Sequence, residues 1–223
     1  MNPSTPKNLI TRSSILVLCL FTLLGVNSTV FGDDEGSGIA GKEPASYPLS
    51  PNDNWDLLKI LSLNREQVIA LWSQAPAAPM AELNGHYMGL VPNHGDVENQ
   101  LGTGDYMYNE ASPRGFWLGK AYQATSATEG VGYNRWRLPG GKVVRNGRFA
   151  TKMGTSLIDG KPALMMYYGA YNQDSTLVDE IRKLNDYVYL GLGSTEAADG
   201  TRSEPGHFML VGPTDEWVGV SDF

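Results

Sequence analysis

The sequence predicts a mainly β protein, built as an antiparallel β-barrel of about seven to nine strands. From residue 84 onward the chain consists of short segments rich in aromatic and β-branched residues, and turn signals separate them at regular spacing. Strands are expected over residues 85–91, 115–124, 130–138, 142–154, 161–169, 186–193 and 206–212. Such a series of short strands is typical of an antiparallel sandwich or barrel.

Glycine-containing pairs mark the turns between the strands. Pro139-Gly140-Gly141 and Asp159-Gly160 supply the positive φ angles that tight hairpins require. Asn146-Gly147 is either a turn or a bulge within a strand. These turns favour hairpin connections between neighbouring strands.

A helical region precedes the barrel. Residues 55–74 carry apolar side chains at helical spacing and predict one helix or two short ones. Asn64 is placed to cap the second part, with Gln67 three residues further on. Pro76 ends the helical pattern. We expect the apolar stripe of this region to pack on the barrel.

A second helix is expected within the barrel, over residues 175–184. Its acids come first and its bases last, as the helix dipole prefers, and Leu177, Ile181 and Leu184 form one apolar face. This inserted helix would cover one end of the barrel. Residues 92–113 show no clear periodicity and predict a long loop, a feature that is usually functional or mobile.

Residues 1–32 predict a secretory signal peptide. Lys7 and Arg12 form a basic start, and residues 15–24 form an apolar run that is too short to span a bilayer as a helix. The protein is therefore expected to be exported, to the periplasm or the extracellular space, without a membrane span after cleavage.

Cleavage after Gly32 is favoured over cleavage after Ser28, because an acidic segment follows Gly32. Either cut removes Cys19, the only cysteine, so the mature chain can have no disulfide. Residues 33–52 are rich in Gly, Ser, Pro and acidic residues and predict a flexible acidic tether. Residues 53–223 then form a single barrel domain preceded by a helix.

Charge and motifs exclude several classes of function. The chain carries 17 Lys and Arg residues against 24 Asp and Glu residues, a net charge of −7, which argues against a nucleic-acid partner. It contains no Gly-any-Ser-any-Gly elbow and no phosphate-binding loop. Residues 94–98 hold one His and two acids, without a second His at metal-like spacing. We expect no cofactor and no bound metal.

Aromatic and basic side chains on the predicted strands are the candidates for a ligand-binding site. The predicted ligand-binding residues are Trp117, Lys120, Tyr133, Trp136, Arg148 and His207. The aromatic residues would form apolar walls, Lys120 or Arg148 would anchor an anionic group, and His207 would donate or accept a hydrogen bond. Alternation places Tyr133 and Trp136 on opposite faces of their strand. Alternatively, the rings fill a packed core and the cations lie on the solvated outer face.

Lys120 is the most informative of these residues. Alternation places it on one strand face with Phe116, Leu118 and Tyr122. A cation among such side chains must be paired or wet. Its partner would be an anionic group of a ligand or a fixed acid such as Glu180.

Two glycine-containing segments resemble a known family. Residues 85–89 read Gly-His-Tyr-Met-Gly, and residues 115–120 read Gly-Phe-Trp-Leu-Gly-Lys. This order resembles the bacterial GXWXG family, named for a Gly-any-Trp-any-Gly strand followed by a Trp/Tyr-any-Gly-Lys strand, with Tyr87 standing where the family has Trp. Residues 156–164 also resemble uncharacterised bacterial β-barrel proteins of lipocalin-like character. The resemblance covers about residues 65–212 and implies a lipocalin-like barrel, without an assigned activity.

Three functions fit these observations. The first is an exported binding protein for a small apolar or amphipathic ligand, including an anionic one, held in the barrel. The second is an enzyme that uses His86 or His207 with a tyrosine for acid–base chemistry. The third is a filled barrel that acts as a structural or interaction module. An internal void favours the first function, a His beside an acid in a cleft favours the second, and a packed interior favours the third.

Overall fold

A computed structural model describes residues 51–219 of the chain. The predicted signal peptide, residues 1–32, lies outside the described residues, and so do residues 33–50 of the predicted tether.

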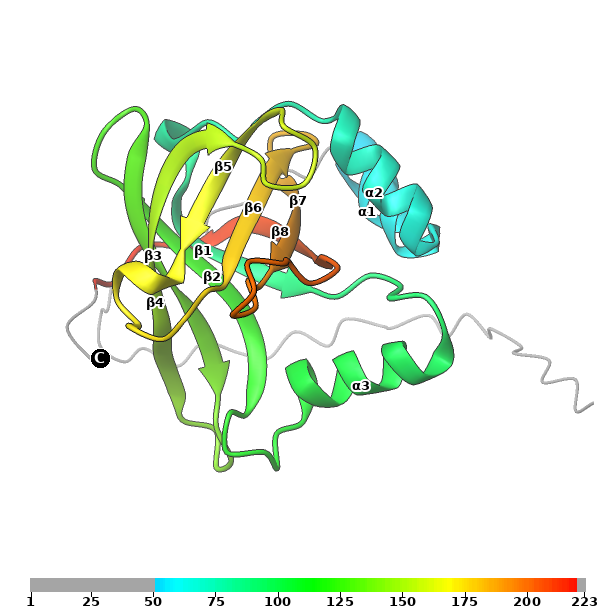
Figure 1. Cartoon of the computed structure of the whole chain (residues 1–223). Helices are drawn as coiled ribbons and strands as arrows, with labels where there is room; N and C mark the ends of the chain where they lie inside the picture. Colours follow the sequence, from blue (N-terminus) through cyan, green and yellow to red (C-terminus); the bar gives the residue numbers. More distant parts are fainter. Residues whose placement is uncertain (1–50, 220–223) are drawn as a thin grey trace, which may run out of the picture. The chain divides into compact units, whose positions relative to one another are not determined.

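Eight antiparallel strands close into a barrel in sequence order, with the last strand pairing with the first (Figure 1). The strands are β1 (Asn84–Leu90), β2 (Phe116–Ala124), β3 (Glu129–Arg137), β4 (Val143–Thr155), β5 (Pro162–Tyr167), β6 (Val178–Lys183), β7 (Val188–Ser194) and β8 (Gly206–Asp215). This up-and-down arrangement of eight strands is the architecture of lipocalins. The prediction of a mainly β, lipocalin-like antiparallel barrel is confirmed, and each of the seven predicted strands is present.

The inserted helix predicted over residues 175–184 is wrong, because this segment contains β6. Val178–Lys183 pairs with β5 on one side and with β7 on the other. The helical spacing of its apolar residues coincides with an unusual strand, in which Asp179 lines the barrel interior and Glu180 is buried on the outer face. Pairing with two neighbours outweighs the low β-propensity of these acids.

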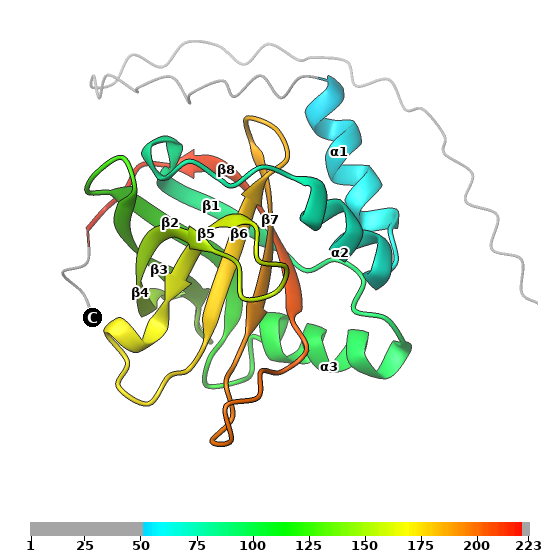
Figure 2. The same cartoon turned by 45° about the horizontal axis from the view of Figure 1, so that its top comes forward.

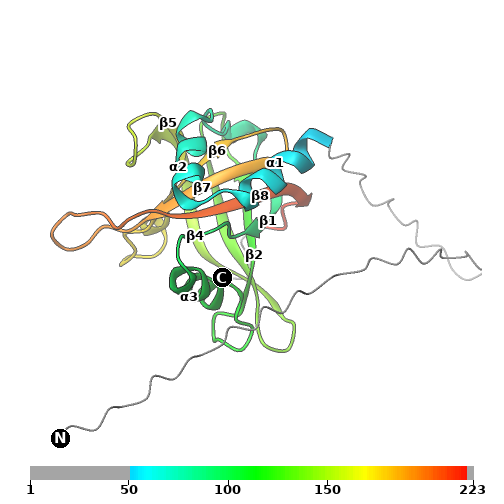
Figure 3. The ribbon, with the colours of Figure 1, turned by 90° about the vertical axis from the view of Figure 1, so that its right-hand side faces the viewer.

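Two helices precede the barrel, as the sequence predicts. They are α1 (Pro51–Ser62) and α2 (Arg65–Gln74). Asn64 caps α2 through a capping box, in which its side chain accepts from the Gln67 backbone N–H and its own N–H donates to the Gln67 side chain, both at 2.9 Å. Ile60, Val68 and Trp72 pack with apolar residues of β7 and β8. Figures 2 and 3 show both helices beside this part of the barrel.

The long loop predicted over residues 92–113 contains a third helix, α3 (Val97–Tyr108), so this prediction is wrong over most of its length. Asp96 caps the helix by accepting from the Asn99 backbone N–H at 2.8 Å. Gly102 and Gly104 lower its helix propensity, and no residue of α3 is buried. A helix without a buried apolar stripe gives no strong periodic signal. In Figure 1, α3 lies apart from α1 and α2.

Bulges in β2 and β4 redirect side chains within the sheet. In β2 the register shifts between Trp117 and Gly119, which leaves Leu118 as an extra residue. Trp117 and Lys120 therefore both face the interior, although strict alternation places them on opposite faces. In β4 the register shifts near Gly147, whose φ of 55° marks this position as a bulge rather than a turn.

The barrel interior is filled at one end. Aromatic side chains of neighbouring strands pack edge to face there, with Tyr87 5.6 Å from both Tyr122 and Tyr189 between ring centroids. Met80 and Leu83, just before β1, belong to the same buried cluster. The opposite end, where β1 finishes and β2 begins, encloses a cavity.

We predict that the filled end carries much of the stability of the barrel. Ile181 of β6 is fully buried in this cluster. Ile181→Ala removes three methyl or methylene groups from a packed core and is expected to lower the free energy of unfolding by about 2–5 kcal/mol. Chemical denaturation measures the change. Leu157→Ala, at a side chain that is half exposed, is the control and should have little effect; equal losses in the two variants would contradict the assignment.

Candidate functional site

A cavity of about 640 Å³ occupies the hollow end of the barrel. Aromatic rings form much of its wall, and α3 lies across its opening. The barrel contributes Val91, Trp117, Lys120, Asn134, Trp136, Tyr168, Leu177, Asp179, Gly193, Gly206, His207 and Phe208, and the β1–β2 segment contributes His94, Glu98, Asn99, Gly102, Thr103, Tyr106 and Met107. A cavity of this size, mainly apolar with a few polar groups, is typical of a small-molecule site.

A cluster of four polar side chains forms the polar part of the cavity wall. The ammonium of Lys120 donates to Asp179 Oδ2 at 2.8 Å, to the Tyr168 hydroxyl at 2.5 Å and to Asn134 Oδ1 at 2.9 Å. The Tyr168 hydroxyl donates to Asp179 Oδ2 at 2.9 Å. Lys120 and Asp179 are 3% and 5% exposed. The cluster is therefore a buried ion pair whose charged groups are also held by neutral hydrogen-bonding partners.

Neighbouring rings and amides hold this polar cluster in place. Asn134 Nδ2 donates to the Tyr168 hydroxyl at 3.0 Å and to the Gly147 carbonyl at 3.4 Å, at the β4 bulge. The indole N–H of Trp117 donates to Asn134 Oδ1 at 3.2 Å. Both bulges thus contribute to the site, because one brings Trp117 inward and the other presents a carbonyl to Asn134.

Burial dominates the electrostatics of the polar cluster. Burial lowers the pKa of Lys120, and the attraction of the Asp179 carboxylate opposes that lowering. Burial, together with the negative charge of Asp179, raises the pKa of Tyr168 well above its ordinary value. Tyr168 therefore stays a neutral phenol and acts as a hydrogen-bond donor to the carboxylate.

Two stacked histidines stand at the edge of the cavity. The His94 and His207 rings are nearly parallel, with their centroids 4.1 Å apart. His94 Nδ1 lies 2.8 Å from the Pro92 carbonyl, and His207 Nε2 contacts the Asn93 carbonyl. A carbonyl only accepts, so these nitrogens carry the protons. Burial lowers the pKa of both rings, that of His207 to about 4, so both are uncharged at neutral pH.

The helix α3 covers the cavity as a loosely packed lid, defined here as residues 97–108. Its residues at helical spacing, including Glu98, Gly102 and Tyr106, turn toward the cavity. Val97 and Leu101 are 74% and 68% exposed. The first turn of the lid is held to the preceding segment, because the Gln100 side chain accepts from the His94 backbone N–H at 2.8 Å.

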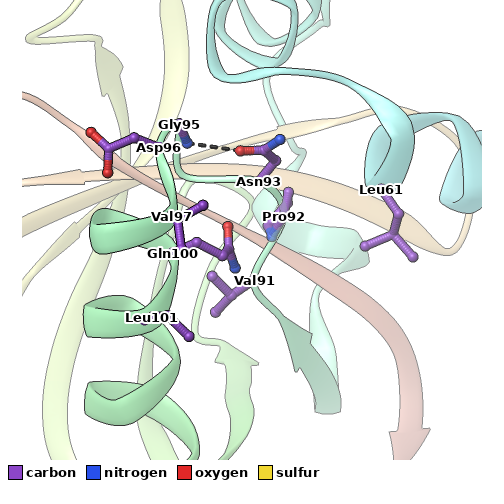
Figure 4. A pocket seen from close by; sticks show the side chains of 9 residues that line it. All are labelled: Leu61, Val91, Pro92, Asn93, Gly95, Asp96, Val97, Gln100 and Leu101. Atoms are coloured by element: carbon purple, nitrogen blue, oxygen red, sulfur yellow. Dashed lines mark hydrogen bonds between the residues drawn. The ribbon is translucent and has the colours of Figure 1, made fainter. Parts of the chain in front are cut away.

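A second hollow, of about 440 Å³, lies outside the barrel at the start of the lid. Figure 4 shows it between Leu61 of α1, the end of β1 and the first turns of α3. Asn93 forms its inner edge and accepts from the Gly95 backbone N–H at 2.8 Å. Its apolar lining residues Leu61, Val97 and Leu101 are mostly exposed, and it contains none of the buried charged groups of the cavity. The cavity is therefore the better candidate for a site.

The structure brings four of the six predicted ligand-binding residues together. Trp117, Lys120, Trp136 and His207 all line the cavity. Tyr133 lies on the other face of β3, as alternation places it, and its ring packs 4.7 Å from that of Trp217 between centroids. Arg148 lies elsewhere as well, with its guanidinium 4.0 Å from the centre of the Tyr171 ring.

The fixed acid that pairs with Lys120 is Asp179. The sequence suggested its neighbour Glu180, which is one residue away and wrong. Because residues 178–183 form a strand, Asp179 and Glu180 point to opposite faces of the sheet. Glu180 instead accepts from the Leu157 backbone N–H at 2.8 Å. Once residues 178–183 are recognised as a strand, alternation places Asp179 on the interior face. Asn134 had a signal in the sequence, since it shares a strand face with Trp136, whereas Tyr168 had none.

The predicted pairing of a histidine with a tyrosine occurs outside the cavity. His86 Nε2 lies 3.0 Å from the Tyr133 hydroxyl. Burial, and then the positive charge of Arg135, lower the pKa of His86 to about 4. Neither His86 nor Tyr133 lines the cavity.

Metal ligation and membrane-spanning helices are absent from residues 51–219. In that part of the chain, no group of three or more His, Cys, Asp or Glu residues is arranged to hold a metal ion. None of the helices there is long and apolar enough to cross a membrane.

We predict that the Lys120–Asp179 pair is essential to the barrel. Lys120→Met leaves the carboxylate buried without its cation and is expected to lower the free energy of unfolding by about 3–5 kcal/mol. Combining it with Asp179→Asn removes both charges and should restore part of the loss. Denaturation of the single and double variants measures this coupling.

The matched control is Lys152→Met, which removes an exposed ion pair with Glu129 at 3.4 Å on neighbouring strands. It should cost at most about 1 kcal/mol. Equal losses from Lys120→Met and Lys152→Met would show that the cavity pair is unimportant.

The lowered pKa of His207 predicts a loss of stability in acid. Between pH 6.5 and about 4 the unfolded chain binds a proton at this imidazole and the folded chain does not. The free energy of unfolding therefore falls as the pH is lowered through this range. His207→Gln removes this contribution, so its stability should depend less on pH than that of the parent. Urea denaturation at several pH values tests this, and identical pH profiles would refute it.

Comparison with known proteins gave structural similarities of low sequence identity. Comparison with protein-family models gave no match, and comparison with curated protein sequences gave none either. A crystal structure of a protein from Thermomonospora curvata is 18% identical, with a TM-score of 0.49, covering 70% of this chain and 95% of that one. An odorant-binding protein, OBP1, is 12% identical, with a TM-score of 0.33, covering 64% of this chain and 78% of that one. Similarities at these scores carry no information on function.

Proposed function

We propose that this protein binds a small apolar or amphipathic molecule in the cavity beneath α3. One observation carries the proposal: the barrel is filled at one end and hollow at the other, and the hollow end has aromatic walls around a single internally paired polar cluster. An eight-stranded barrel is just wide enough to hold one small ligand. Trp117, Trp136 and Phe208 would provide the apolar contacts.

The other two functions have less support. A filled barrel does not account for a cavity of about 640 Å³ lined by side chains of several strands. For an acid–base enzyme, the paired histidine and tyrosine would have to contact the substrate, whereas His86 and Tyr133 lie outside the cavity. Within the cavity, the described contacts of His207 are with the Asn93 carbonyl and the His94 ring, and neither is an acid or a tyrosine.

We further propose that the protein acts outside the cytoplasm. This rests on the basic start and the short apolar run of residues 1–32, which lie outside the described residues. N-terminal sequencing of protein purified from its own host tests this proposal. A chain that begins at residue 29 or residue 33 supports it, and an intact residue 1 refutes it.

Ligand binding is tested with N-phenyl-1-naphthylamine, a neutral apolar probe that fluoresces in apolar surroundings. We predict saturable binding of one probe per chain. Gly102→Phe should abolish it, because Gly102 lines the cavity and its open surroundings let the ring enter. Fluorescence titration measures the binding.

Gly104→Phe is the matched control for this prediction. Gly104 lies in the same helix, has the same open surroundings and does not line the cavity. Both substitutions replace a helical glycine, so their effects on helix propensity are alike. The proposal fails if the parent protein does not bind the probe, or if the two variants bind it equally well.

A further inference from the structure

We infer that the ligand is a neutral apolar molecule carrying a hydroxyl group, and that this hydroxyl donates a hydrogen bond to Asp179 Oδ1. The inference rests on the proposed function, since it names the chemical class that the same cavity would hold. It replaces the expectation of an anionic ligand anchored by Lys120 or Arg148.

The donors of the polar cluster are already used within the cluster. An ammonium has three N–H donors, and Lys120 directs them to Asp179, Tyr168 and Asn134. The Tyr168 hydroxyl donates to Asp179, and both hydrogens of the Asn134 amide have acceptors. The cluster therefore offers no donor to the carboxylate of a ligand, although it contains a cation.

An acceptor remains on the Asp179 carboxylate. Its Oδ2 accepts from Lys120 and Tyr168, whereas no hydrogen bond from residues 51–219 reaches its Oδ1. Asp179 and Gly193 both line the cavity, and a Cβ atom added at Gly193 would lie 2.3 Å from Oδ1. The absence of a side chain at residue 193 thus lets the Asp179 carboxylate lie against β7 and still line the cavity. A carboxylate oxygen in such a place binds a donor.

The stacked histidines at the edge of the cavity offer no donor to a ligand. His94 and His207 direct their protonated nitrogens to backbone carbonyls, so the other nitrogen of each ring carries a lone pair. Glu98 on the lid adds a further acceptor. The neutral donors of the lining outside the polar cluster are Asn99, Thr103 and Tyr106 on the lid and the indole N–H of Trp136. The Asn99 amide already donates to Asp96 Oδ2 at 3.2 Å.

The charges of Lys120 and Asp179 favour a ligand hydroxyl over a ligand carboxylate or ammonium at this place. Lys120 and Asp179 together are neutral, so a carboxylate would place a second negative charge near Asp179 without a charged partner of its own. A ligand ammonium that reached Asp179 would lie close to the Lys120 ammonium, which shares that carboxylate. A hydroxyl donates a hydrogen bond and adds no charge, so it satisfies Oδ1 with neither repulsion.

The experiment compares three probes that share one alkyl chain: 1-decanol, decanoate and decylammonium. Each is titrated at neutral pH into the full chain loaded with N-phenyl-1-naphthylamine, and displacement of the fluorescent probe gives its affinity. We expect 1-decanol to bind about tenfold or more tightly than either ion, as a buried group left without its partner implies. If decanoate or decylammonium binds as tightly as 1-decanol, the inference is wrong and the proposed function stands. If the fluorescent probe itself does not bind, both are wrong.

A pair of variants tests the place of the hydroxyl. Gly193→Ala puts a methyl group against Asp179 Oδ1 and should remove the preference for 1-decanol over decanoate. Gly206→Ala is the control, because Gly206 also lines the cavity and an added Cβ meets nothing within 4 Å. Retained binding of N-phenyl-1-naphthylamine shows that each variant is folded. A preference for 1-decanol that survives Gly193→Ala would overturn the assignment to Oδ1, and if that variant does not fold, the order of the three probes on the parent protein decides.

Discussion

The ion pair between Lys120 and Asp179 is the constraint on which the hollow end of the barrel depends. Two charges can remain inside a barrel only when they neutralise each other and their hydrogen-bonding groups are satisfied. Asn134 of β3 and Tyr168, which directly follows β5, complete that requirement. The pair thus ties β2 to β6 across the interior, where apolar packing is interrupted by the cavity. Because Lys120 is paired with Asp179, it is not available to bind an anionic ligand in the cavity.

The two ends of the barrel divide stability and binding between them. At one end the rings of Tyr87, Tyr122 and Tyr189 pack edge to face and lie in one buried cluster with aliphatic side chains. Outside the barrel, Arg182 of β6 holds α2 against the sheet. Its guanidinium stacks 3.8 Å from the centre of the Trp72 ring of α2 and forms an ion pair with Asp159 at 2.7 Å. A protein anchored in this way can leave its other end unfilled, where empty volume would otherwise destabilise it.

The strands and hairpins could be predicted from the sequence, whereas much of the site could not. Short segments rich in aromatic and β-branched residues, separated by glycine turns, identify seven strands. The strand that the sequence did not indicate is β6, which carries Asp179 and Glu180. These acids are acceptable there because Lys120 and the Leu157 backbone, far away in the sequence, pair with them. The local sign of the β2 bulge at Leu118 is one glycine within the strand, Gly119, which does not say which side chains the bulge turns inward. The bulge decides that Trp117 and Lys120 share the cavity. Long-range pairing, rather than local propensity, determines these features.

The two glycines of α3 affect the rate at which a ligand could enter and leave. Each glycine destabilises a helix by roughly 0.8–1 kcal/mol relative to alanine, and α3 has no buried residue to compensate. A segment of this kind opens at a lower free energy than the strands beneath it. Exchange of the cavity contents would then follow the local unwinding of one helix, while the eight-stranded sheet remains closed. Residence time and global stability would therefore respond to different substitutions, the first in α3 and the second in the barrel.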